Sequence, residues 1–225
     1  MSELTKEILD GVRRTAALQL WDLGAVKVNL DQPFKLTSGN FSPIYLNCRQ
    51  LISSTAFADL FAAAARMICE IENVKFDVVA GGETAGIPFA AFLARAFGRP
   101  MVYVRKAAKE HGVASLVEGS FVSGARVMLV EDLITDAGSK LHFVGGITAA
   151  GGVVEDVLVA FDRQQGGMAA LKAKGIRLHS VTDMEMALDV AVKAKAISAE
   201  GLAAIREYLS SPKAWHTQRR LAYVG

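Results

Sequence analysis

The sequence has little excess charge and few cysteines. Its 225 residues carry 25 Lys and Arg against 23 Asp and Glu, a formal net charge of +2. Such a small excess argues against a protein that coats nucleic acid through bulk charge. The two cysteines, Cys48 and Cys69, lack CxxC spacing and His-rich neighbours, which argues against a zinc site. They are typical of buried thiols in a reducing compartment.

Long apolar runs and a leader peptide are also lacking. The most apolar stretch, residues 78–94, is interrupted by Glu83, several glycines and Pro88, so it is too broken to span a bilayer. The first residues lack the charged start and apolar run of a secretory signal. Hydrophobic residues make up 52% of the chain, which excludes a disordered protein. We therefore expect a cytoplasmic protein that binds neither membranes nor nucleic acid.

The spacing of apolar residues predicts helices that alternate with strands. Helices are expected at residues 4–20, 55–71, 87–97, 139–150 and 165–174, from a capping box at 182–185, and from 198 onward. Strands are expected at 76–80, 101–105, 126–130, 153–161 and 176–180, with Gly81 and Gly82 ending the first. This alternation predicts a parallel sheet covered by helices on both faces. Ligands of such folds bind at the carboxyl ends of the strands.

One segment joins a buried strand to two adjacent acids and a turn of small residues. It runs from Val127 to Ser139 and contains Glu131 and Asp132. Backbone N–H groups of a turn that opens a helix can bind an anion. Carboxylates beside such a turn suit ribose hydroxyls, Mg²⁺ or positive charge developing on a sugar. The carboxylate pair alone fits a solvated turn with a helix cap equally well.

A basic segment follows the strand at 101–105. Residues 105–111 contain Arg105, Lys106, Lys109 and one Glu, and His111 ends the segment. A solvated charge run is the usual explanation for such a loop. Beside a phosphate site, however, a mobile basic loop could cover pyrophosphate and then open.

Two other segments also follow strands. Residues 81–88 are rich in glycine, which allows the backbone to approach a ligand closely, and Pro88 fits a first helical turn. Residues 161–167 contain Arg163, which could hold a carboxylate through two hydrogen bonds. A tight turn and a surface pair of Arg163 with Asp162 are the structural alternatives.

A fifth segment, residues 34–47, lies near the N-terminus. It is typical of a strand, a Ser-Gly turn and a second strand, and a purely structural hairpin would explain it. Lys35 and Thr37 are two residues apart, and such positions in a strand share a face.

Together these segments resemble the orotate phosphoribosyltransferase family. Residues 127–139 resemble the phosphoribosyl-diphosphate (PRPP) signature of type I phosphoribosyltransferases, although relatives usually have a small or hydroxyl residue at Asp136 and glycine at Ala137. The Arg-Lys-x-x-Lys-x-His-Gly spacing of residues 105–112 resembles the family's catalytic loop. Residues 38–43, 81–88 and 161–164 have counterparts in the same order.

The resemblance implies a fold and a division of the chain. The expected fold is α/β, of the type I phosphoribosyltransferase kind, with a central parallel sheet flanked by helices and a small N-terminal hood. We expect a single domain over residues 1–225. Its parts are an N-terminal helix and hood at about residues 1–50, a core at 51–195, and a C-terminal helix and tail at 196–225.

The resemblance also assigns residues to roles. Lys109 is the expected catalytic lysine, with Glu131 and Asp132 holding the ribose hydroxyls and favouring a cationic sugar. PRPP contacts are expected from Thr84, Ala85, Arg105, Lys106, Lys109, His111, Glu131, Asp132, Leu133, Ile134, Thr135, Asp136, Ala137, Gly138 and Ser139. Orotate contacts are expected from Tyr45, Leu46, Thr135 and Arg163. Because many relatives carry a PRPP-binding lysine at the position of Thr37, we hypothesise that Lys35 partly substitutes for it, with Arg49 as a second nearby cation.

The implied reaction joins orotate and PRPP to give orotidine 5′-phosphate and pyrophosphate, a step of UMP synthesis. Mg²⁺ is expected as cofactor, held mainly by PRPP, with no certain protein ligand and Asp132 reaching it through water. A homodimer is expected, in which the loop 105–118 is shared across the interface. A phosphoribosyltransferase for another nucleobase is the alternative. A PRPP-sensing regulator is disfavoured, since no DNA-binding helix pair precedes the domain.

Overall fold

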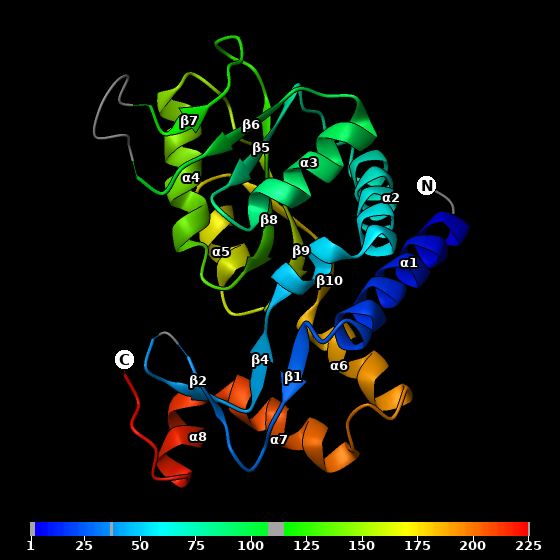
Figure 1. The fold of residues 1–225 in the computed structure, drawn as a ribbon, viewed down its shortest axis with the longest axis vertical. Coiled ribbons are helices and arrows are strands. Elements are labelled where there is room, and N and C mark those ends of the chain that lie inside the picture. The colour runs from blue at the N-terminus through cyan, green and yellow to red at the C-terminus, as the bar shows by residue number, and fades with distance from the viewer. Residues whose placement is uncertain (1–2, 37, 108–114, 225) are drawn as a thin grey trace.

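A six-stranded sheet forms the centre of the computed structural model (Figure 1), which describes all residues except 1–2, 37, 108–114 and 225. The strand order is β10-β9-β8-β5-β6-β7, and every neighbouring pair is parallel except β6 and β7. The strands are β5 (Val78–Gly82), β6 (Met101–Val104), β7 (Val117–Glu118), β8 (Val127–Ile134), β9 (Asp156–Asp162) and β10 (Arg177–Asp183). The predicted fold class is confirmed.

Helices cover both faces of this sheet (Figure 1). On one side lie α1 (Glu3–Asp22), α2 (Thr55–Ile71), α3 (Gly86–Phe97) and α6 (Met184–Lys193). On the other side lie α4 (Gly138–Ala149) and α5 (Gly167–Lys172). Alternate residues of β8 face the two sides: Met128 and Val130 belong to the first hydrophobic cluster, whereas Val127 and Leu129 belong to the second. Burial on both faces explains the continuous apolar run of this strand.

Short strands and the last helices gather at one end of the molecule (Figure 1). Two antiparallel pairs form there, between β1 (Val26–Val28) and β4 (Ile44–Leu46) and between β2 (Phe34–Lys35) and β3 (Phe41–Ser42). We call these four strands the hood. The 3-10 helix η1 (Cys48–Ser53) leads from the hood to α2. The helices α7 (Ala199–Ser210) and α8 (Pro212–Gln218) lie beside the hood.

Several predicted boundaries were wrong, and each error has a physical reason. Gly81 and Gly82 were expected to end a strand, but both belong to β5. A Cβ at Gly81 would lie 2.8 Å from Cα of Ile87, so this glycine lets α3 pack closely on the sheet. The strand β8 runs four residues further than expected, so Glu131 and Asp132 lie within it.

Two helix starts show where a capping signal locates a helix correctly and where it is misplaced by one residue. Ser198 was expected to open a helix, and its side chain accepts a hydrogen bond from Gly201 N–H at the start of α7. The capping box at 182–185 was misassigned, because Thr182 still belongs to β10. The residue that caps α6 is Asp183, which accepts from Met186 N–H at 2.9 Å.

Candidate active site

Two adjoining cavities open at the carboxyl ends of the parallel strands, as expected for this kind of sheet. The larger has a volume of about 590 Å³ and is lined by Lys35, Leu36, Ser38, Ile44, Tyr45, Leu46, Arg49, Thr135, Asp136, Arg163, Gln165 and Tyr208. The smaller has a volume of about 250 Å³ and is lined by Arg49, Glu83, Thr84, Ala85, Lys106, Glu131, Asp132, Ser139 and Phe143. Arg49 lies on both, so it marks their common boundary.

The smaller cavity contains a buried acid held by a buried base. Nζ of Lys140 lies 3.1 Å from Oε2 of Glu131, and both side chains are less than one-tenth exposed. The other carboxylate oxygen, Oε1, has no hydrogen-bond partner within the described residues. Burial raises the pKa of Glu131 to about 7, in opposition to the lowering effect of Lys140. Burial also raises the pKa of the adjacent Asp132, and Lys140 again opposes the shift.

The glycine-rich turn after β5 is built around this acid. A Cβ added to Gly82 would lie 2.1 Å from Oε1 of Glu131, and one added to Gly86 would lie 2.2 Å from the same atom. Both positions therefore require glycine. Between them, Thr84 and Ala85 line the smaller cavity, as does Glu83. The turn thus brings main-chain groups close to the carboxylate pair.

The turn from Thr135 to Ser139 joins the two cavities to the start of α4. Thr135 and Asp136 line the larger cavity and Ser139 the smaller. Ala137 has φ of 72°, a left-handed conformation that favours glycine. Oδ1 of Asp136 accepts a hydrogen bond from Gly138 N–H at 2.9 Å, so this carboxylate occupies one of the backbone donors at the helix start.

Two members of the predicted PRPP signature face away from the cavities. Ile134 is fully buried in the hydrophobic cluster beneath α4 and α5, and Leu133 packs against the opposite cluster. Neither side chain lines a cavity, so any contribution of these residues to ligand binding would come from their backbone.

The larger cavity contains a half-buried guanidinium. Arg163 follows β9, and its Nε is buried without a hydrogen-bond partner in the described part of the chain. Burial lowers the pKa of Arg163. A buried guanidinium nitrogen without a partner is costly, so it marks a place where an anion would bind favourably. The hood supplies Lys35, Tyr45 and Leu46 to the same cavity, and the rings of Tyr45 and Phe34 lie 5.6 Å apart.

The basic segment is described only at its start, residues 105–107. Lys106 lines the smaller cavity, and its N–H donates to Oε2 of Glu83 at 2.8 Å. Nη1 of Arg105 lies 3.8 Å from Oε1 of Glu118, and Arg105 lines neither cavity. Lys109 and His111 lie outside the described residues, as does Thr37.

Three residues of this region belong to none of the motifs identified in the sequence. Lys140 sits in a helix, where a lysine is normally solvated, and only the fold reveals its pairing with Glu131. Tyr208 reaches the larger cavity from α7, far along the chain. His142 lies 3.0 Å, through its Nε2, from the carbonyl oxygen of Lys106 and so holds the start of the basic segment.

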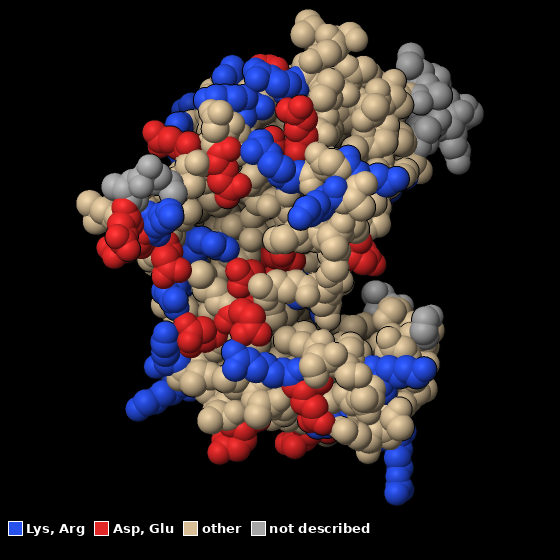
Figure 2. Space-filling view, turned by 180° about the vertical axis from the view of Figure 1, so that it is seen from behind, with Lys and Arg blue, Asp and Glu red and all other residues tan. Residues whose placement is uncertain are grey.

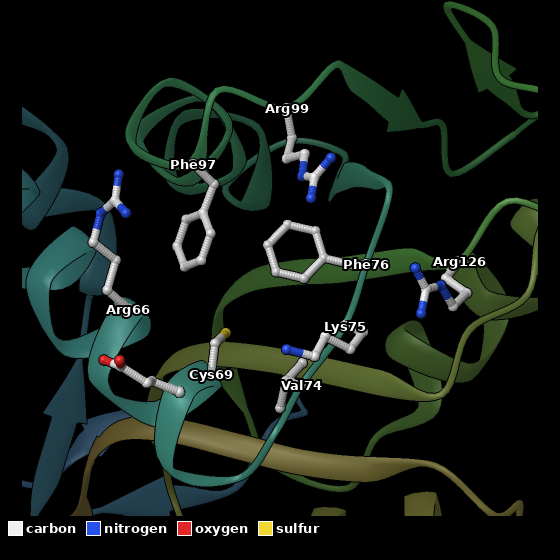
Figure 3. A pocket seen from close by; sticks show the side chains of 9 residues that line it. Arg66, Cys69, Val74, Lys75, Phe76, Phe97, Arg99 and Arg126 are labelled. Atoms are coloured by element: carbon white, nitrogen blue, oxygen red, sulfur yellow. The ribbon is translucent and has the colours of Figure 1, made fainter.

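A third cavity, of about 320 Å³ (Figure 3), lies at the amino ends of β5 and β8. Its basic side chains are those of Arg66, Lys75, Arg99 and Arg126, and Lys and Arg also gather at this end of the surface in Figure 2. Several of these charges have local partners. Arg126 donates to both oxygens of Asp77, and Arg66 lies 4.9 Å from the centre of the Phe97 ring. Within the described residues, no side-chain nitrogen or oxygen of this cavity is buried without a partner, unlike Nε of Arg163 and Oε1 of Glu131.

Comparisons with known proteins agree with this geometry. The phosphoribosyl transferase domain family matches residues 50–169. The orotate phosphoribosyltransferase of Sinorhizobium medicae is 43% identical over 203 residues, which are 88% of each chain. The chain belongs to the orotate phosphoribosyltransferase family. The residues of the domain match include the last four residues of η1, the glycine-rich turn and both acids of the family's PRPP signature.

Solved structures of the orotate phosphoribosyltransferase family share the fold. The UMP synthase of Leishmania donovani is 29% identical with a TM-score of 0.77, covering 89% of this chain and 43% of that one. This chain thus spans less than half the length of that protein. The orotate phosphoribosyltransferase of Mycobacterium tuberculosis H37Rv in complex with PRPP is 27% identical with a TM-score of 0.61, covering 79% of this chain and 92% of that one.

Among the described helices, none is both long and apolar enough to cross a membrane.

Proposed function

We propose that this protein transfers the 5-phosphoribosyl group of PRPP to orotate, releasing pyrophosphate and orotidine 5′-phosphate in the synthesis of UMP. The observation that carries the proposal is the pair of adjoining cavities. One contains the half-buried guanidinium of Arg163, whose Nε has no partner in the described residues, and the other contains two acids beside a glycine-rich turn. Orotate is anionic and the reacting sugar becomes cationic, so each cavity suits one of the two reactants.

Orotate would bind in the larger cavity. The guanidinium of Arg163 would take the orotate carboxylate through charge-assisted hydrogen bonds, which are stronger than neutral ones. Thr135 would add a hydroxyl contact, and Tyr45 and Leu46 would lie against the base. These four residues line the same cavity, which supports their common assignment.

The ribose and pyrophosphate of PRPP would bind across the smaller cavity. Asp132 and Glu131 would hold the ribose hydroxyls and stabilise positive charge that develops as the bond at ribose C1 breaks. Thr84 and Ala85 would offer backbone contacts to pyrophosphate, with Lys106 and Arg105 from the basic segment. Lys35 of the hood would add the cation that Thr37 does not supply; within the described residues it makes no ion pair.

The turn from Thr135 to Ser139 would anchor the 5′-phosphate through its backbone N–H groups and the start of α4. Gly138 N–H is already bonded to Asp136 in the free protein. Binding would therefore require the phosphate to displace this carboxylate or to use the remaining donors of the turn. The backbone of Leu133 and Ile134 would complete the PRPP site.

The proposed reaction uses Mg²⁺. In the parts of the chain that the structure describes, no three His, Cys, Asp or Glu side chains are grouped to hold a metal ion. Mg²⁺ keeps several waters and binds readily to substrate phosphates, so an ion carried mainly by PRPP fits the acids of the smaller cavity, with Asp132 reaching it through water. When bound, the ion would neutralise charge on the departing pyrophosphate.

We further propose a cytoplasmic homodimer, with residues 1–225 acting as one domain. In the family, the loop that corresponds to residues 105–118 reaches the neighbouring subunit's site. Lys109 would then be the principal catalytic lysine and His111 a pyrophosphate contact, both acting across the interface. Closure of this loop would exclude water that could otherwise hydrolyse PRPP.

A comparison of bases tests the proposal. The protein is incubated with PRPP, Mg²⁺ and one base at a time, namely orotate, uracil or adenine, and nucleotide formation is followed chromatographically. We expect orotidine 5′-phosphate from orotate and negligible product from the other two. Preferential conversion of uracil or adenine would contradict the proposal and identify that base as the substrate.

A further inference from the structure

Tyr208 belongs to the larger cavity but lies outside the part of the chain that matches the phosphoribosyl transferase domain family. It comes from α7, and only 3% of its surface is exposed. The accessible part of this residue lines the cavity that also contains Arg163. A residue that is buried almost completely, yet borders a ligand-sized space, is well placed to contact the ligand.

The ring of Tyr208 is held in place by two aromatic neighbours. Its centroid lies 5.1 Å from that of Trp215 and 6.5 Å from that of His216. His216 in turn accepts a hydrogen bond from Phe41 N–H of the hood at 2.9 Å, and its other ring nitrogen lies 2.6 Å from the Pro212 carbonyl oxygen. The rotamer of Tyr208 is therefore fixed before a ligand arrives, which lowers the entropy cost of binding.

The hydroxyl of Tyr208 is not used within the protein. It makes no hydrogen bond to any other residue that the structure describes. The hydroxyl oxygen is not among the fully buried unpartnered atoms of the described residues, so it is open to the cavity. A tyrosine hydroxyl at a cavity wall can donate a hydrogen bond to a ligand there. Tyr208 also lies close enough to Arg163 to oppose the lowering of that residue's pKa by burial.

We propose that Tyr208 is a specificity-determining residue whose hydroxyl donates a hydrogen bond to the carboxylate of orotate, beside Arg163. The inference rests on the proposed function, because it names a second group that recognises the same substrate. A carboxylate has two oxygens with about four acceptor positions, so it can accept from a guanidinium and a phenol together. A base without a carboxylate, such as uracil, would leave both donors unpaired and would therefore be rejected.

The test compares Tyr208→Phe with the parent and with Tyr223→Phe. Tyr223 is a matched control, because its ring also packs against His216, at 5.1 Å, but it does not line the cavity. Binding of orotate and of uracil is measured by titration calorimetry, and KM for each substrate by steady-state kinetics. We expect Tyr208→Phe to weaken orotate binding roughly 10- to 100-fold, the range of a hydrogen bond to a charged group, and to leave uracil binding and the KM for PRPP unchanged.

Equal losses for orotate and uracil, or no loss for orotate, would overturn the assignment. A measurement on the unmutated hydroxyl guards against misfolding of the variant. The chain has four tyrosines, so fluorotyrosine labelling gives four ¹⁹F signals that single Tyr→Phe variants assign. Orotate should shift the Tyr208 signal and uracil should not; the reverse contradicts the proposal. A parent protein that fails to bind orotate would instead refute the proposed function.

Discussion

Replacement of Lys140 by methionine probes the electrostatics of the site most directly. The substitution removes the ammonium that lies 3.1 Å from Glu131 and leaves a side chain of similar length. In the parent, burial already raises the pKa of Glu131 to about 7. Without Lys140 this pKa should rise further, by about 1–3 units, the usual effect of an opposite charge at this distance.

The sign of the effect on stability follows from linkage. A carboxyl whose pKa is raised by folding binds a proton more tightly in the folded state, so stability is greatest at low pH and falls as the pH rises toward the folded pKa. Below about pH 6.5 Glu131 is mostly protonated in both proteins, and the difference in unfolding free energy between them should be constant. Above about pH 7 the variant should lose a further ~1.4 kcal/mol per pH unit until its own, higher pKa is reached.

Chemical denaturation at several pH values between about 5.5 and 8.5 measures this difference. Lys193→Met serves as the control, since it removes a lysine from an exposed helical pair with Asp189. Such a pair contributes about 0–1 kcal/mol, and its carboxyl is ionised over this whole range. If the difference in unfolding free energy between the parent and Lys140→Met stays constant with pH, the argument that Lys140 maintains the charge of Glu131 is refuted.

Three further outcomes are expected. Arg163→Gln removes a charged donor, so it should raise the KM for orotate roughly 10- to 100-fold with little change in the KM for PRPP. Steady-state kinetics with each substrate varied measures both values. An equal change in the two KM values would exclude a base-specific role. Lys109→Ala should lower kcat by at least about 100-fold in a protein that remains folded. Mixing this variant with an inactive Asp132 variant should restore some activity. No recovery after demonstrated subunit exchange would count against a shared site. Ala137→Gly should raise the unfolding free energy by about 0.5–1 kcal/mol, since φ of 72° strains alanine; a loss of stability by thermal denaturation would contradict this.

The alternation of elements and the region of the site followed from local patterns. Strands buried on both faces produce apolar runs such as residues 127–130, and helices such as Thr55–Ile71 show their stripe clearly. Because parallel strands end at the same edge, residues after β5, β8 and β9 could be expected to meet, and Thr84, Thr135 and Arg163 do line adjoining cavities.

Features that depend on distant contacts had no local signal. The length of β8 was underestimated because Glu131 and Asp132 resemble loop residues, and only Lys140 and the space left by the glycines allow an acid to be buried there. Tyr208 could not be connected with the hood, because the link runs through His216, which accepts a hydrogen bond from Phe41, 175 residues away in the chain. The assignments of individual contacts to PRPP and orotate remain predictions for mutagenesis.

The most direct test of the account is a spectrophotometric assay of orotate consumption. The purified protein is mixed with orotate, PRPP and Mg²⁺, and the ultraviolet absorbance of orotate is followed. The account predicts a decrease that requires all three components and yields orotidine 5′-phosphate and pyrophosphate in equal amounts. Unchanged absorbance with folded protein, under conditions in which another base is converted, would contradict it.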